Sequence, residues 1–175
     1  MSEYNLDTKN INEWVTTLNV GDIVNLSGYL YTARDAAHKR IAEALENGDK
    51  LPFELENSVV YYAGPTPAKN GLIIGSIGPT TSSRMDTYSP LMLSQGQKAM
   101  IGKGNRSTEV VDAIKEYKAV YFAAIGGAGA LYSDCVKECE VVAFDELGCE
   151  SVKRLKVEGF SLIVAIDSNG KSLYK

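Results

Sequence analysis

Short apolar runs that end in a turn and lead into a helical pattern recur along this 175-residue chain. The apolar run Leu72–Ile74 leads into the most distinctive of these junctions, Gly75–Asp86 (GSIGPTTSSRMD). This junction contains a Gly-Pro turn, four hydroxyl residues and an arginine. Where a strand turns into a helix, unpaired backbone N–H groups and the positive end of the helix dipole face outward. Hydroxyls at that point cap the helix or contact a ligand, and an arginine one turn later can bind a carboxylate through two N–H groups. A plain helix cap with an exposed arginine fits the same pattern.

The alternation of strand and helix patterns predicts a single mixed α/β domain over residues 1–175. Residues 1–20 are expected to form an N-terminal arm or a short helix. We expect strands at 21–31, 59–63, 71–77, 98–102, 120–125 and 141–144, and a final hairpin of 160–166 and 171–174. We expect helices within 33–45, 84–95 (interrupted by Pro90), 107–114 and 130–139, and a short helical piece that ends at 155. The hairpin adds antiparallel strands, so the sheet should be mixed and layered.

The composition narrows the functional class. Hydrophobic residues make up 45% and charged residues 23% of the chain, as in ordinary globular domains. No apolar run approaches the roughly 18 residues that a membrane span needs, and the first residues lack the basic and apolar regions of a signal peptide. The net charge of −4 disfavours a nucleic-acid surface. We therefore expect a cytoplasmic protein with no membrane or nucleic-acid partner.

Three cysteines are too few and too poorly spaced for a metal centre of their own. Cys135 and Cys139 are expected one helical turn apart on the helix predicted for 130–139, and Cys149 follows separately. We interpret all three as reduced, partly buried thiols and predict no metal ligand on this chain.

Cations and hydroxyls cluster at the predicted strand ends, where α/β sheets bind ligands. The cations are Arg34, Arg84 and Lys103, and we expect Thr81 and the turn residue Gly127 to join them in binding substrate. Such a set suits a small polyanion, either a dicarboxylate or a phosphate ester.

The one histidine lies four residues after Arg34 and therefore on the same face of the predicted helix. His38 could orient a substrate or shuttle a proton, or it could be structural. We place it among the candidate catalytic residues.

Several strings resemble the class I, iron–sulfur-dependent fumarate hydratases, in their C-terminal domain or separate β subunit. They are ARDAAHKR at 33–40, GPTTSSRMD at 78–86, IGKG at 101–104, GGA at 126–128, ELG at 146–148 and VAID at 164–167. The similarity runs from about residue 20 to the C-terminus. The L-tartrate dehydratase β subunit is a close relative that shares the GPTTS-R pattern.

The resemblance implies the swivelling β/β/α three-layer fold and the reversible hydration of fumarate to (S)-malate, a tricarboxylic acid cycle reaction. It implies that Arg34, Arg84 and Lys103 bind the carboxylates and the hydroxyl of the substrate. Thr80 would remove the C3 proton, with neighbouring cations stabilising its alkoxide.

The resemblance also implies a partner. A [4Fe–4S] cluster with one open iron, which polarises the C2 hydroxyl, would be carried by a fumarase α subunit. This chain would be inactive alone and would act in a heterodimer or heterotetramer. The alternatives are an L-tartrate dehydratase β subunit and a non-catalytic anion-binding swivelling module.

Overall fold

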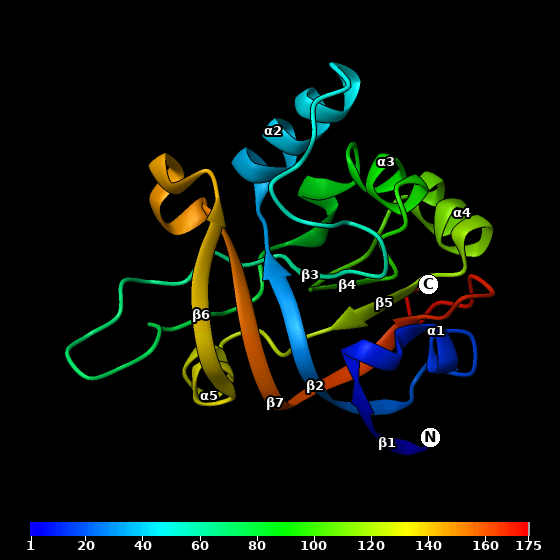
Figure 1. Ribbon diagram of the computed structural model, residues 1–175. Helices are drawn as coiled ribbons and strands as arrows, with labels where there is room; N and C mark the ends of the chain where they lie inside the picture. The colour runs from blue at the N-terminus through cyan, green and yellow to red at the C-terminus, as the bar shows by residue number, and fades with distance from the viewer. Residues whose placement is uncertain (175) are drawn as a thin grey trace.

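The structure, a computed structural model, describes residues 1–174 and contains one seven-stranded mixed sheet that closes on itself (Figure 1). The strands are β1 (Glu3–Asp7), β2 (Ile23–Thr32), β3 (Val59–Tyr61), β4 (Ala99–Gly102), β5 (Val120–Ala123), β6 (Val136–Ala143) and β7 (Val152–Ile166). Their order is β1-β2-β3-β4-β5-β7-β6, and β2 also pairs with β7. The strands from β2 to β5 together with β7 therefore form a barrel-like ring.

The ring closes because β7 is long enough to reach three neighbours. One edge of β7 pairs antiparallel with β2, from Thr32 opposite Lys153 to Ile23 opposite Ile163. Its other edge pairs with β6 near its start and with β5 near its end. The strands β2, β3, β4 and β5 are parallel to one another. The predicted mixed α/β class is confirmed, and the pairing defines a closed sheet, a coarser description than the three-layer arrangement implied by the resemblance.

Three of the helices cover one outer face of this ring (Figure 1). The helices are α1 (Ile11–Trp14), α2 (Asp35–Glu46), α3 (Ser89–Ser94), α4 (Thr108–Tyr117) and α5 (Gly129–Asp134), with 3-10 helices η1 (Thr8–Asn10), η2 (Ser82–Met85) and η3 (Asp145–Glu150). In Figure 1, α2, α3 and α4 lie on the same side of the sheet. None of the helices in residues 1–174 is long and apolar enough to cross a membrane.

Alternate residues of the central strands fill two separate cores. In β5, Val120 and Phe122 face the interior of the ring with Ile101 of β4, whereas Tyr121 faces α3 and α4. Successive side chains of a strand point to opposite faces, so a strand that is buried on both faces reads as a continuous apolar run. This explains why the predictions for 59–63, 98–102 and 120–125 are confirmed.

The N-terminal residues join the sheet through β1, and the short helix that is the other expectation for residues 1–20 is present as α1. β1 pairs in parallel with the first half of β2, and Trp14 and Leu18 of the following segment are buried in the ring core. The polar residues between these apolar ones hide the strand pattern.

The strand expected at 71–77 is absent from the described structure, and this prediction is wrong. Residues 71–77 form a loop in which the Leu72 and Ile73 side chains are 61% and 52% exposed. The helix expected at 84–95 is divided into η2 and α3. Pro90 occupies the first turn of α3, where its missing N–H has no intrahelical acceptor. It therefore lies at the start of a helix instead of interrupting one.

The helix expected at 130–139 is also wrong beyond its first half. α5 ends at Asp134, and Cys139 lies in β6 opposite Leu155 of β7. Cys135 and Cys139 are therefore not one helical turn apart. β7 begins at Val152, so the helical piece expected to end at 155 is wrong as well; η3 occupies only the residues before it.

The expected turn at 167–170 is confirmed, because the Gly170 N–H donates to the Asp167 carbonyl over 2.9 Å. Its second arm is shorter than expected. Only Ser172 forms a bridge, to Ile166.

Candidate functional site

The segment Thr80–Ser82 lies against the C-terminal ends of β3 and β4. The Thr80 N–H donates to the Tyr62 carbonyl over 2.7 Å, and the Ser82 N–H donates to the Lys103 carbonyl over 2.9 Å. Thr81 thereby pairs in parallel with Lys103. Two predicted site segments, far apart in sequence, are thus brought side by side, and both Thr81 and Lys103 are exposed.

Arg34 follows β2 and lies across the end of β3. A Cβ added to Gly64 would be 3.0 Å from Cδ and 3.1 Å from Nη1 of Arg34, so a side chain at residue 64 would press against Arg34. Arg34 Nε lies 3.9 Å from Glu150 Oε1, and the Arg34 side chain is 25% exposed. Its Nε is buried and has no hydrogen-bond partner in the described structure. Arg34 therefore keeps an unused donor.

Arg84 is bound through two contacts to the residue that follows Arg34. Its Nε donates to Asp35 Oδ1 over 2.9 Å, and its Nη2 lies 2.8 Å from Asp35 Oδ2. Asp35 is the first residue of α2, where a negative charge suits the helix dipole. The Arg84 side chain is 50% exposed, so this ion pair contributes about 1 kcal/mol or less to stability. Its main consequence is geometric, because it joins the start of α2 to η2.

The glycine turn after β5 lies beside Lys103. A Cβ added to Gly126 would lie 3.8 Å from Lys103 Cδ, and Gly127 is exposed with a φ of +82°. That φ is in the left-handed region, which favours glycine. The two arginines, Lys103 and the two turns thus lie at the same end of the sheet, where the parallel strands have their C-terminal ends.

His38 also lies near this end of the sheet, but its side chain is buried below the surface. Its Nδ1 lies 2.9 Å from the Arg34 carbonyl, which can only accept, so Nδ1 carries the proton. Its ring packs edge-on against Tyr62, with centroids 5.2 Å apart. Burial lowers the pKa of His38 from 6.5 to about 4, so the ring is neutral at pH 7. A catalytic role for His38 stays a prediction, as do the roles of Thr80 and the cations.

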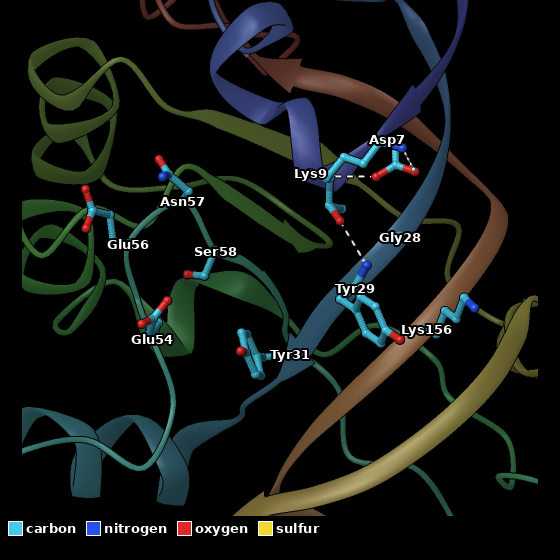
Figure 2. Close-up of a pocket in the computed structure, with 11 residues that line it drawn as sticks. Asp7, Lys9, Gly28, Tyr29, Tyr31, Glu54, Glu56, Asn57, Ser58 and Lys156 are labelled. Carbon is cyan, nitrogen blue, oxygen red and sulfur yellow. Dashed lines mark hydrogen bonds and ion pairs between the residues drawn. The ribbon is translucent and has the colours of Figure 1, made fainter.

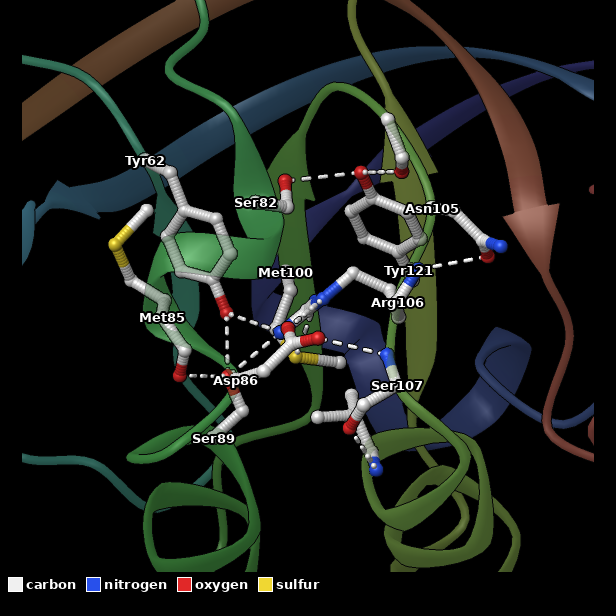
Figure 3. Close-up of polar contacts among 12 residues, drawn as sticks. Tyr62, Ser82, Met85, Asp86, Ser89, Met100, Asn105, Arg106, Ser107 and Tyr121 are labelled. Atoms are coloured by element: carbon white, nitrogen blue, oxygen red, sulfur yellow. Dashed lines mark hydrogen bonds and ion pairs between the residues drawn. The ribbon is translucent and has the colours of Figure 1, made fainter.

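The sequence analysis missed Arg106, which is buried below the same end of the sheet (Figure 3). Its side chain is fully buried, and its Nε donates to Asp86 Oδ1 over 2.7 Å. Nη2 donates to Ser89 Oγ over 2.7 Å, and the guanidinium carbon lies 5.3 Å and 4.9 Å from the ring centroids of Tyr62 and Tyr121. Burying an unpaired cation costs several kcal/mol, which these contacts offset.

The three cysteines do not form a ligand set for an iron–sulfur cluster. Burial raises the pKa of the Cys135 and Cys139 thiols, which disfavours the thiolates that bind metals. Within residues 1–174, no three histidine, cysteine, aspartate or glutamate side chains are grouped to hold a metal ion. The side chains described here do not fit such a cluster.

The structure also contains a cavity that lies away from the predicted site residues. A cavity of about 370 Å³ between the start of the chain, β2 and the loop before β3 is lined by Tyr29, Tyr31, Glu54, Glu56 and Lys156, among others (Figure 2). It contains none of the predicted site residues. Glu54 and Glu56 in its lining disfavour the binding of a dicarboxylate there.

Comparison with known proteins identifies relatives over nearly the whole chain. The model of the family described as Fumarase C-terminus matches residues 1–175. The chain is 46% identical over 167 residues to the "Putative L(+)-tartrate dehydratase subunit beta" of Methanocaldococcus jannaschii, covering 92% of this chain and 86% of that protein. It is 42% identical over 157 residues to "Fumarate hydratase 2" of Leishmania major, covering 89% of this chain.

A third relative is "Fumarate hydratase class I, aerobic" of Escherichia coli, which is 37% identical over 154 residues, or 87% of this chain. The match covers only 28% of the Leishmania protein and 28% of the E. coli protein, against 86% of the Methanocaldococcus subunit. This chain therefore corresponds to one part of the longer fumarate hydratases and to nearly all of a separate β subunit. The chain belongs to the Fumarase C-terminus family, and its relatives include class I fumarate hydratases and a tartrate dehydratase β subunit.

Proposed function

We propose that this chain is the β subunit of a two-subunit hydro-lyase that interconverts fumarate and (S)-malate. The observation that carries the proposal is the pairing of Thr81 with Lys103, which sets the Thr80–Arg84 segment, with its own arginine, beside a second cation. Family membership supports the reaction class. We further propose the swivelling β/β/α description of the fold, a cytoplasmic location and a place in the tricarboxylic acid cycle.

The two arginines would bind the substrate carboxylates. Asp35 accepts one hydrogen bond from Arg84, at Nε, and its Oδ2 lies 2.8 Å from Nη2 without a hydrogen bond, so the Nη protons remain for a carboxylate. Arg34 has a free Nε donor. Lys103 would bind the hydroxyl or a second carboxylate as a point charge. The Thr81 hydroxyl and the Gly127 backbone N–H would complete the binding set.

Thr80 would remove the C3 proton. A threonine hydroxyl is a weak base, so its alkoxide requires nearby positive charge, and the neighbouring Lys103 segment supplies it. His38 is neutral and buried between Tyr62 and Tyr88. We therefore propose that it supports the site by holding the Arg34 carbonyl rather than by contacting substrate.

An α subunit would complete the site. We propose that it corresponds to the part of the longer relatives that this chain does not cover, and that it carries a [4Fe–4S] cluster. When bound, such a cluster acts as a Lewis acid toward the substrate hydroxyl. The assembly would be a heterodimer or a heterotetramer, and this chain would be inactive alone.

A second candidate substrate is tartrate. The observation that favours it is the 46% identity to a protein named as a putative L(+)-tartrate dehydratase subunit beta. Fumarate hydration and tartrate dehydration use the same class of binding groups, so the cations described here do not discriminate between them. A non-catalytic anion-binding module is the remaining alternative.

The test is anaerobic turnover by this chain, alone and co-expressed with its candidate α subunit, on fumarate and on L-tartrate in parallel. We expect fumarate hydration in the mixture only. Tartrate turnover without fumarate turnover would replace the substrate. No turnover of either, with dicarboxylate binding still measurable by calorimetry, would favour the binding module. The Arg84→Lys variant is the matched control for binding, because it keeps the charge and loses the two-point contact.

A further inference from the structure

A buried tyrosine hydroxyl joins the two segments of the candidate site. Tyr121 Oη lies 2.9 Å from Ser82 Oγ and 2.9 Å from the Gly104 carbonyl oxygen (Figure 3). A carbonyl only accepts and a phenol has one proton, so Tyr121 donates to Gly104 and its oxygen accepts from the Ser82 hydroxyl. Ser82 directly follows Thr81, and Gly104 directly follows Lys103. The phenol thus connects the neighbours of two proposed substrate-binding residues.

Arg106 fixes the position of this tyrosine. Its guanidinium lies between the rings of Tyr121 and Tyr62, and its Nε is held by Asp86. Asp86 Oδ2 also accepts from the Ser107 N–H over 2.7 Å. Asp86 follows Arg84 by two residues, and Arg106 follows Gly104 by two residues. The buried ion pair therefore joins the same two segments a second time, from below.

The packing around Ser82 leaves little freedom. Ser82 is fully buried, and a Cβ added to Gly102 of β4 would overlap its Oγ. Ser82 therefore occupies a slot that exists only because residue 102 is a glycine. Its hydroxyl has a fixed direction toward Tyr121.

We propose that Tyr121, held by Arg106, is a positioning residue that sets the spacing between the Thr80–Thr81 backbone and Lys103. The structural part of this inference stands on the contacts alone, and its consequence for turnover rests on the proposed function. Reacting groups that are misplaced by an ångström lose much of their rate. We therefore predict that removing the Tyr121 hydroxyl lowers kcat and does not only lower stability.

The test compares Tyr121→Phe with Tyr62→Phe. Both variants remove one hydroxyl from a ring that flanks Arg106, but the Tyr62 hydroxyl contacts Ser89 of α3 and the Arg106 guanidinium, and it contacts neither Ser82 nor Gly104. In the complex with the α subunit, we expect Tyr121→Phe to lower kcat about tenfold or more with a smaller change in KM, and Tyr62→Phe to keep the parent kcat. Melting temperatures of the two variants should fall by similar amounts.

Hydrogen exchange provides a readout that does not require turnover. The Ser82 amide, which donates to the Lys103 carbonyl, should exchange about tenfold faster in Tyr121→Phe and at the parent rate in Tyr62→Phe. Equal effects of the two variants on kcat and on exchange would overturn the inference and leave a purely structural cluster. If the parent complex has no activity, a selective rise in exchange would still support the link that Tyr121 makes between the two segments, while the proposed function fails. An unchanged exchange rate of the Ser82 amide in Tyr121→Phe would overturn that link itself.

Discussion

Arginines of two kinds lie within this site, and they differ in their exposure and in the groups that surround them. At the solvent-facing surface of the site, which we call the rim, Arg34 and Arg84 have side chains 25% and 50% exposed. Each of them faces a single carboxylate of its own chain. Below them, Arg106 is fully buried and contacts a carboxylate, a hydroxyl and two aromatic rings. The rim arginines retain donors for a ligand, whereas Arg106 has its donors engaged within the chain. The comparison separates the arginines that we propose bind the substrate from the arginine that we propose positions the site.

Replacing Arg106 should have the largest effect on stability. Arg106→Met leaves Asp86 buried without its cation, and breaking a buried pair in this way costs about 3–5 kcal/mol of unfolding free energy. Arg84→Met removes a half-exposed pair and should cost about 1 kcal/mol or less. Urea denaturation of both variants measures the difference. Equal losses would erase the distinction between rim and buried arginines.

His38 connects the two regions, and its acid sensitivity should be the next largest effect. It touches the Arg34 carbonyl and the rings of Tyr62 and Tyr88, and both Arg106 and Asp35 act on it electrostatically. Its pKa is about 4 in the folded chain and 6.5 in the unfolded one, so the unfolded chain takes up a proton first as the pH falls. Stability is therefore complete above pH 6.5 and falls toward pH 4, by up to about 3 kcal/mol.

The measurement is the free energy of unfolding between pH 4 and pH 7 for the parent and for His38→Phe. All carboxylates remain in the variant, and His38 is the one histidine of the chain. The pH dependence that the variant loses therefore belongs to this ring. If the two curves are parallel, the ring is not neutral and buried in solution.

Arg84→Lys should lower activity without affecting the fold. A lysine keeps the charge but loses the planar two-point contact, so we expect kcat/KM of the complex to fall roughly 10- to 100-fold. Arg154→Lys is the matched control, because Arg154 is also a half-exposed arginine paired with a carboxylate, Glu140, but lies on β7 outside the site. Turnover near the parent value in Arg84→Lys would remove Arg84 from the binding set.

The parts of the site that could be predicted are those that depend on local pattern. The end of a buried apolar strand is readable from a run such as 98–102, so Lys103 could be placed at a sheet edge before the structure was known. The helix after Ser107 was equally readable, because Ser107 caps α4 with its side chain as its residue type predicts. The apolar triplet at 72–74 misled the same reasoning, since nothing in the sequence shows that it lacks a neighbouring strand.

Arg106 could not be predicted, because its environment is assembled from distant segments. Tyr62, Asp86 and Tyr121 belong to different elements, and only the closed sheet brings them around one guanidinium. In sequence, Arg106 is one cation in a Gly-Asn loop before a helix cap. For the same reason, the sequence predicted only the last part of β6, at 141–144, and its earlier residues were identified by their pairing with β7.

The smallest expected effect concerns a cysteine outside both regions. Cys135 is half-buried at the end of α5, where its Sγ lies 3.6 Å and 3.7 Å from the carbonyl oxygens of Leu131 and Gly159. A serine hydroxyl can make the same contacts, so Cys135→Ser should change stability by about 1 kcal/mol or less. The iron content of the complex with the α subunit should not change, and Cys139→Ser should behave alike. Loss of iron from either variant would assign a metal to this chain. The chemistry of this domain would then involve its cysteines as well as the cations at the rim.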